Sequence, residues 1–164
     1  MQKLFTKSLS RSLDPKGRLM LPPEYREALC AGAADGEQGT FWLTSFYGRL
    51  VAYLPADWEA VTEQLSRIRF PSPKLSHFKT KVMGLAQELA PDPQGRVRIP
   101  QSLMREAGLQ KDVMLVGMLN KFEIWDQNRF DALQLEDVSE ELAASGVDTV
   151  SYTHLRAHET DSYL

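Results

Sequence analysis

The sequence predicts a β-rich α+β fold, in which two tandem β-α-β-β repeats close into one pseudo-twofold β-barrel with peripheral helices. Three observations predict this fold. A stretch at residues 14–22, "DPKGRLMLP", returns at residues 92–100 as "DPQGRVRIP". Each copy then continues through one helix signal and two strand signals in the same order. One copy alone is too small to bury a stable core, so we expect the two copies to share one.

Each repeat opens with a tight turn and a short strand. "DPKG" and "DPQG" match a type I turn, with Asp first, Pro second and Gly fourth. The alternating run that follows places Leu19 and Leu21 on one face of the strand and Arg18 on the other. The second copy repeats this alternation, with Arg96 on the polar face. We therefore predict two equivalent strands, each with an arginine facing solvent.

The remaining elements of each repeat follow from similar signals. Prolines end both short strands and suit the first turn of a helix, and Gly108 suits the end of the second helix. Each helix leads to two strands, "TFWLTSF" and "GRLVAYLP" in the first copy, and "DVMLVGM" and "NKFEIWD" in the second. An Asp then starts a closing helix in each copy, and Phe130 and Leu133 form the apolar face of the second one.

Pairing the strand edges of the two copies removes free edges from the sheet, which favours a closed barrel. The two turns then lie at symmetry-related positions on one surface. We expect residues 1–70 to form the first repeat with its closing helix, residues 71–83 a connecting helix, residues 84–140 the second repeat with its closing helix, and residues 141–164 a terminal segment.

The final residues, "VSYTHLRAHETDSYL", differ in character from the rest of the chain. They show no sustained periodicity and contain two of the three histidines. The segment resembles a translated cloning or adapter sequence, and a disordered natural terminus is the alternative. Residues 150–164 are therefore given no role in the predicted fold or function.

Composition indicates a globular protein without a membrane segment. The chain has 164 residues, of which 43% are hydrophobic and 25% charged. No apolar run is long enough to span a bilayer, and the N-terminal residues lack the apolar core of a signal peptide. Cys30 is the single cysteine, so an internal disulfide is impossible and a reducing compartment is expected. These features predict a cytoplasmic protein.

The formal net charge of −3 conceals strong segregation of charge. Residues 3–26 carry +4, residues 67–98 carry +5, and residues 123–148 carry −7. Both basic segments contain one of the repeated turns. An acidic C-terminal third can therefore mask a basic face that suits a nucleic-acid partner.

Three stretches carry a resemblance to a known family: "LDPKGRLMLPPEYREAL", "LAPDPQGRVRIPQSLMREAGL" and "DVMLVGMLNKFEIWDQNRFDAL". They resemble the MraZ family, whose halves are AbrB/SpoVT-type swapped-hairpin domains, over residues 1 to about 140. The resemblance implies a bacterial transcription factor that binds double-stranded DNA repeats upstream of the division and cell-wall gene cluster. It also implies a ring-shaped homo-oligomer associated with the nucleoid. The D-x-x-x-R arginines of the family contact DNA, and here these are Arg18 and Arg96.

The chemistry of these arginines supports the same interpretation. A guanidinium directly behind a tight turn can donate two hydrogen bonds to a phosphate or to the O6 and N7 atoms of guanine. The alternative is an ordinary strand arginine paired with its own aspartate. Arg98 lies on the same face as Arg96 where the first copy has Met20, so the two DNA surfaces are expected to differ.

The rest of the predicted DNA-binding set surrounds the two arginines. We expect Asp14 and Asp92 to accept backbone N–H groups and orient the arginines rather than to touch DNA. Lys16 and Gln94 occupy the turn tips, where they can face phosphate. Arg11 extends the basic surface, or is a solvated residue of an edge strand.

Other functional classes fit the sequence less well. His77 and Cys30 lie in separate segments without metal-ligand spacing, and no nucleotide-binding or hydrolase motif is present. We therefore expect neither an enzyme nor a cofactor, metal or small-molecule substrate. The rival interpretation is an oligomeric protein-interaction scaffold, whose basic turns meet an acidic protein surface. A closer variant is an AbrB-like antitoxin, which binds both DNA and a toxin.

Overall fold

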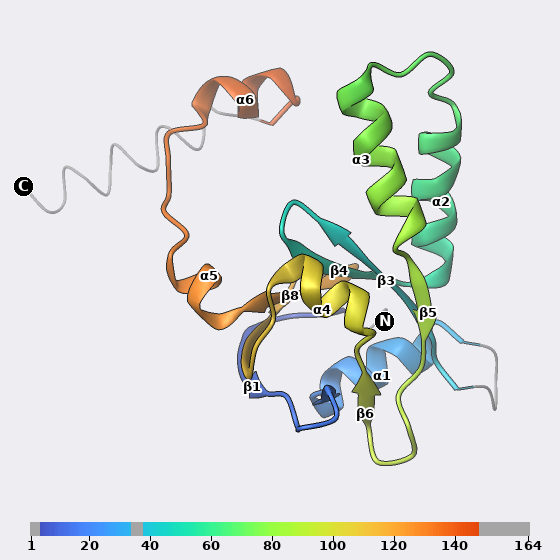
Figure 1. The fold of residues 1–164 in the computed structure, drawn as a ribbon, viewed down its shortest axis with the longest axis vertical. Helices are drawn as coiled ribbons and strands as arrows, with labels where there is room; N and C mark the ends of the chain where they lie inside the picture. Colours follow the sequence, from blue (N-terminus) through green and yellow to red (C-terminus); the bar gives the residue numbers. More distant parts are fainter. Residues whose placement is uncertain (1–3, 34–37, 148–164) are drawn as a thin grey trace, which may run out of the picture. The chain divides into compact units, whose positions relative to one another are not determined.

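The computed structural model describes residues 4–33 and 38–147, and this part of the chain contains six helices and eight strands. Residues 1–132 and 133–164 form two compact units, which are described separately below. The first unit contains both repeats (Figure 1). The predicted mixed α+β class is confirmed, and the sheet pairing is antiparallel throughout.

The two repeats contain the same elements in the same order. The first consists of β1 (Ser8–Ser12), β2 (Arg18–Met20), α1 (Pro23–Ala31), β3 (Phe41–Phe46), β4 (Arg49–Tyr53) and the closing helix α2 (Pro55–Ser66). A connecting helix, α3 (Pro73–Gly84), leads to the second repeat. The second consists of β5 (Gln87–Leu89), β6 (Arg96–Arg98), α4 (Gln101–Ala107), β7 (Asp112–Gly117), β8 (Lys121–Asp126) and α5 (Gln127–Asp131).

The repeats are interlocked by exchange of their first strands. A six-stranded sheet has the order β1-β7-β8-β4-β3-β5, so β1 of the first repeat pairs with β7 of the second, and β5 pairs with β3. β2 and β6 pair with each other in a separate two-stranded sheet, which we call the ribbon. The predicted closed barrel is not found among the described strands. β2 and β6 pair with each other and do not join β1 to β5, so β1 and β5 remain sheet edges.

Local sequence explains the ends of the key helices. Proline occupies the first turn of α1, and Gly108 ends α4 in the left-handed conformation with φ of +62°. The predicted length of the second closing helix is wrong. α5 ends at Asp131, and Leu133 is 55% exposed, because the chain leaves the first unit after Ala132.

Two groups of buried side chains hold the first unit together. The main core lies between the six-stranded sheet, the ribbon, α1 and α4, and includes Leu19, Val97 and the packed rings of Phe5, Tyr25 and Phe122. Burial raises the pKa of Tyr25 to about 12, and its hydroxyl donates to the Lys7 carbonyl.

The second group fixes the helical hairpin of α2 and α3. It joins Trp58 and Leu65 of α2 and Val82 of α3 to Val51 and Tyr53 of β4. The hairpin separates the two repeats in sequence, and its core is distinct from the one that supports the ribbon.

The second unit contains one short helix in its described part, α6 (Ser139–Ala144). Within residues 4–33 and 38–147, no helix has the length and apolar character needed to cross a membrane. Residues 150–164, which were predicted to be non-native or disordered, lie outside the described residues.

Candidate nucleic-acid interface

The first turn is built around the carboxylate of Asp14. Its Oδ1 accepts backbone N–H groups from Lys16 and Arg18, both at 2.9 Å, and its Oδ2 accepts the Arg18 Nε–H at 2.5 Å. Gly17 donates its N–H to the Asp14 carbonyl at 2.9 Å and has φ of +74°, a conformation that favours glycine. One side chain thus closes the turn and fixes the direction of the arginine.

The second turn repeats this geometry. Oδ1 of Asp92 accepts N–H groups from Gln94 and Arg96, both at 2.9 Å, and Oδ2 accepts the Arg96 Nε–H at 3.0 Å. Gly95 closes the turn with φ of +87°. Each aspartate thus accepts the N–H groups of its own turn and a hydrogen bond from its own arginine.

These hydrogen bonds also stabilise the ionised form of both aspartates. The backbone N–H of Arg18 contributes most to lowering the pKa of Asp14 below its ordinary value, and the guanidinium adds to the effect. The backbone N–H of Arg96 has the same dominant effect on the pKa of Asp92. Both carboxylates are therefore charged at neutral pH and hold their arginines through charge-assisted bonds.

The ribbon brings the two turns together. Leu19 pairs with Val97, its counterpart in the other repeat, and both side chains are buried. The N–H of Leu21 donates to the Gly95 carbonyl, and the N–H of Ile99 donates to the Gly17 carbonyl, both at 3.0 Å. The exchanged pairs show that a local twofold axis passes between Leu19 and Val97.

Leu19 and Val97 point into the core. Because side chains alternate along a strand, the residues before and after each of them face away from the core. Arg18 lies directly opposite Arg98, and Met20 lies directly opposite Arg96. Arg18 and Arg96 are thus diagonal neighbours on one face, a relation in which long side chains can reach each other. The structure therefore brings Arg18, Arg96 and Arg98 together.

The two turn arginines keep hydrogen-bonding capacity for a partner. Each side chain is 30% exposed, and each donates through Nε to its own aspartate. Within the described residues, neither makes another side-chain hydrogen bond. Each guanidinium therefore retains its outer N–H groups, which suit a bidentate acceptor.

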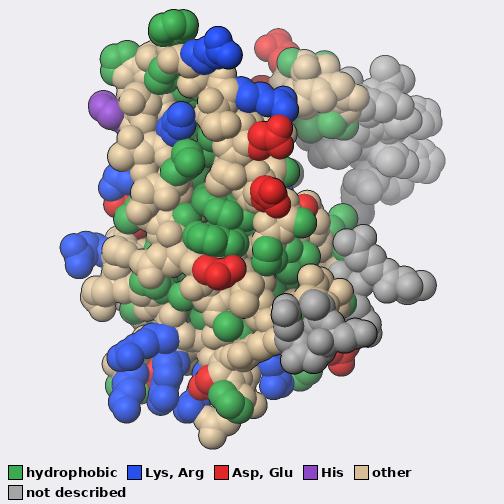
Figure 2. All heavy atoms as spheres, turned by 90° about the vertical axis from the view of Figure 1, so that its right-hand side faces the viewer, with side chains coloured by type: hydrophobic (Ala, Val, Ile, Leu, Met, Phe, Trp, Pro, Cys, Tyr) green, Lys and Arg blue, Asp and Glu red, His purple; other side chains and the backbone are tan. Residues whose placement is uncertain are grey.

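Figure 1 shows both turns at the lower end of the first unit, and Lys and Arg side chains gather at that end of the face in Figure 2. Lys16 and Gln94 are exposed at the turn tips. Beside the first turn lies a hollow of about 820 Å³, whose lining includes Lys16, Gly17, Arg98 and Met104.

Arg11 belongs to a different sheet from the ribbon. It belongs to β1, the edge strand of the six-stranded sheet, where it pairs with Val113 and donates to the Ser10 carbonyl at 3.1 Å. Sequence reasoning did not include Arg26, which lies against the second turn. The alignment of the two copies was its only signal, since it places Arg26 where the second copy has Met104.

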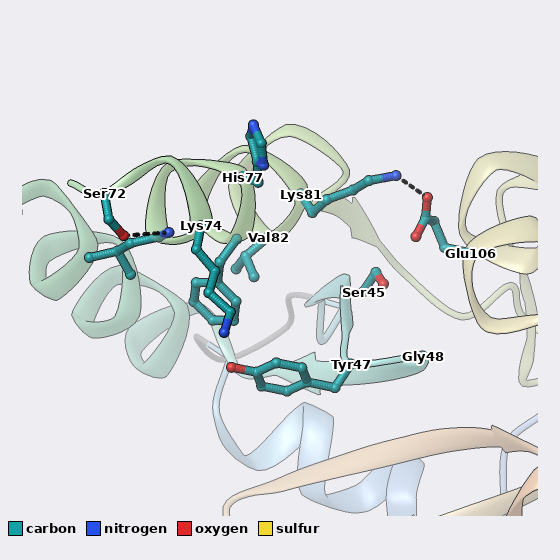
Figure 3. Close-up of a pocket in the computed structure, with 11 residues that line it drawn as sticks. Ser45, Tyr47, Gly48, Ser72, Lys74, His77, Lys81, Val82 and Glu106 are labelled. Atoms are coloured by element: carbon teal, nitrogen blue, oxygen red, sulfur yellow. Dashed lines mark hydrogen bonds and ion pairs between the residues drawn. The ribbon is translucent and has the colours of Figure 1, made fainter.

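A second hollow lies away from the ribbon, between α3 and the β3–β4 hairpin (Figure 3). It has a volume of about 570 Å³. Tyr47, Phe78 and Val82 give it an apolar lining, and the Lys81 ammonium pairs with Glu106 at its rim. In the described part of the chain, no group of three or more His, Cys, Asp and Glu side chains is arranged to hold a metal.

The fold and the site define a class of protein: two β-α-β-β repeats joined by strand exchange, with an Asp–Arg turn from each repeat on a shared ribbon. A family model described as "MraZ protein, putative antitoxin-like" matches residues 82–150. The chain is 50% identical over 148 residues to the transcriptional regulator MraZ of Nitratidesulfovibrio vulgaris, covering 88% of this chain and 97% of that protein.

Two further relatives carry the same name. The transcriptional regulator MraZ of Oleidesulfovibrio alaskensis is 48% identical, with 84% of this chain and 93% of that protein covered. The protein of Escherichia coli K12 is 37% identical, with 82% of this chain and 88% of that protein covered. The chain belongs to the MraZ family.

Proposed function

We propose that this chain is a transcriptional regulator that binds double-stranded DNA through the outward face of the ribbon. The names of its relatives support regulation of transcription as the general function. The observation that carries the proposal is the shared position of Arg18 and Arg96, each oriented by an aspartate and each with outer N–H groups available. A guanidinium in this state suits both phosphate and guanine.

The cost of this arrangement also supports an anionic partner. Arg18 and Arg98 face each other directly across the ribbon, and like charges in such pairs are destabilising. Phosphate groups placed against the ribbon relieve this repulsion and release bound counterions. Asp14 and Asp92 act indirectly by holding the arginines, whereas Lys16 and Gln94 face the DNA backbone from the turn tips.

The finer part of the proposal concerns the target and the assembly. We propose that the DNA consists of repeated boxes upstream of the division and cell-wall gene cluster, and that several chains bind them as a ring associated with the nucleoid. Repeated weak contacts on one assembly gain affinity through effective concentration. Exposed aromatic side chains support self-association, with Tyr47 75% and Phe70 97% exposed in the single chain.

The direct test is binding to the DNA upstream of the chain's own gene, measured by gel shift at several salt concentrations. Arg18→Ala with Arg96→Ala is expected to abolish specific binding, while light scattering shows an unchanged assembly size. Arg67→Ala is the matched control, because Arg67 is exposed directly after the end of α2 and pairs only with Glu63 among described residues. Normal binding by the double variant would rule out the ribbon as the DNA site.

A protein-interaction scaffold or antitoxin is the second candidate, favoured by the apolar hollow beside α3 and by the wording of the family description. A protein partner in that hollow contacts Phe78 and leaves the ribbon unaffected. The two functions therefore separate by variant: Phe78→Glu disrupts this partner, and the double arginine variant disrupts DNA binding. If the double arginine variant still binds promoter DNA and Phe78→Glu no longer binds a purified toxin, an antitoxin role replaces the role of transcriptional regulator.

A further inference from the structure

Arg26 crosses from the first repeat to the turn of the second. It belongs to α1, yet a Cβ atom placed on Gly95 would lie 2.6 Å from its Nη1 and 2.8 Å from its Cδ and Cζ. Gly95 is buried, whereas Gly17 in the first turn is only half-buried. The guanidinium of Arg26 therefore lies directly on the backbone of the second turn, one residue before Arg96.

Arg26 has no partner for its charge within the described residues. Its Nε is buried without a hydrogen bond, and its side chain makes no ion pair or hydrogen bond to residues 4–33 or 38–147. An arginine side chain has five N–H donors and no acceptor, so its hydrogen bonds need acceptors on other groups. A buried donor left without an acceptor destabilises the folded chain. The two Nη groups of Arg26 are not among the buried unpaired atoms of the described residues, so they remain accessible to an acceptor on a ligand.

The corresponding position at the first turn is apolar. Met104 of α4 takes the place of Arg26, and its sulfur lies 3.2 Å from a Cβ placed on Gly17. On the ribbon the difference runs the other way: the second repeat has an arginine, Arg98, where the first repeat has a methionine, Met20. Arg98 lines the hollow beside the first turn together with Met104. Each turn is thus accompanied by one additional arginine, from the ribbon at the first turn and from a helix at the second.

We propose that Arg26 binds a DNA backbone phosphate at the second turn, beside the acceptor held by Arg96, and that Arg98 provides the corresponding contact at the first turn. This proposal rests on the DNA-binding function proposed above. Phosphate suits Arg26 better than a base edge, because Arg26 belongs to α1 and not to the ribbon, and its guanidinium lies against the turn backbone. Phosphate contacts fix the register of a protein on DNA, so the two turns hold the duplex in different ways.

The test compares Arg26→Met with the intact chain by fluorescence anisotropy on promoter DNA, across a range of salt concentrations. Met is the residue found at the equivalent position, so the substitution copies an environment that the fold already accepts. Loss of one phosphate contact is expected to weaken binding about five- to tenfold at 0.15 M salt, and to reduce the slope of log K against log salt by about 0.9. Arg26→Lys keeps the charge and is expected to retain most of the slope.

A charge-conserving exchange, Arg26→Met with Met104→Arg, separates position from overall charge. The exchange moves the cation to the first turn, so promoter affinity is expected to remain low. Full recovery of affinity in the exchange variant, or a wild-type slope in Arg26→Met, would overturn the proposal. The double variant of Arg18 and Arg96 distinguishes the two claims: if it abolishes binding while Arg26→Met has no effect, only the role of Arg26 fails. If it binds normally, the proposed function itself fails.

Discussion

The two turns share one backbone and one Asp–Arg pair, and they differ in the residues that surround that pair. The first turn has Arg98 opposite Arg18 on the ribbon and Met104 against its glycine. The second has Met20 opposite Arg96 and Arg26 against its glycine. Both copies thus keep the Asp–Arg pair that orients the arginine, while the position of the additional arginine differs between them.

This difference gives the ribbon a direction. A symmetric pair of turns would bind a symmetric DNA site in either of two equivalent orientations. With one additional arginine exposed on the ribbon and the other packed over a turn, the two orientations present different charge patterns to the phosphate backbone. In the proposed ring, every ribbon would then have the same polarity along the proposed DNA site.

The largest expected effect on stability comes from the two turn glycines. Gly17→Ala places a side chain at φ of +74° and is expected to cost about 1–2 kcal/mol of unfolding free energy. Gly95→Ala has the same conformational cost, and in addition its Cβ would meet Arg26. Gly95→Ala should therefore be the more destabilising change, measured by urea unfolding with matched slopes.

A double-mutant cycle between Gly95→Ala and Arg26→Ala isolates the contact. We expect a coupling free energy of about 0.5–3 kcal/mol, because the alanine methyl displaces a guanidinium only when the arginine is present. The same cycle between Gly17→Ala and Arg26→Ala should give additive effects. Equal destabilisation by the two glycine variants, with no coupling to Arg26, would contradict the packing described for the second turn.

A smaller effect is expected at the ribbon position that differs between the repeats. Arg98→Met copies Met20 and should lower the salt dependence of DNA binding by about one phosphate contact, a slope change of about 0.9. Met20→Arg should raise the slope, although repulsion from Arg96 directly opposite offsets part of the gain in affinity. Salt titrations of the two single variants on the same promoter DNA measure both changes. Identical slopes in all three proteins would mean that this ribbon position does not contact phosphate.

The smallest expected difference concerns pH, where the two turns should behave alike. The folded-state pKa values of Asp14 and Asp92 lie below the ordinary value of 3.8, so their stabilising contribution is fully present above pH 3.8. It is lost as the pH falls below 3.8 through the folded-state pKa values. Unfolding midpoints of Asp14→Asn and Asp92→Asn should therefore approach that of the intact chain only at acidic pH. A difference in unfolding midpoint between each variant and the intact chain that widens on acidification would contradict the direction of both pKa shifts.

Much of the site could be predicted from the sequence because its signals are local. A four-residue turn with Asp, Pro and Gly at fixed positions specifies its own hydrogen bonds, and alternation places Arg18 and Arg96 on the polar face. The prolines and Gly108 likewise mark helix ends that the structure confirms. These features depend on residues within a few positions of one another.

The features that the sequence did not predict depend on contacts between distant segments. The exchange of β1 and β5 leaves two sheet edges where a closed barrel was expected, and no local pattern distinguishes these outcomes. Leu133 fits a helical stripe, yet the chain has already left the first unit. No pattern in the residues near Arg26 predicts a role for it, and only the packing of the two repeats places it on Gly95.

The most direct measurement of the central claim is protection of individual arginines from phenylglyoxal by bound promoter DNA, read by mass spectrometry of the peptides. If the ribbon is the DNA-binding face, Arg18 and Arg96 are protected together, whereas Arg67, with a side chain 73% exposed directly after α2, reacts equally with and without DNA. Unchanged modification of Arg18 and Arg96 in the complex, with protection of Arg67, would contradict it.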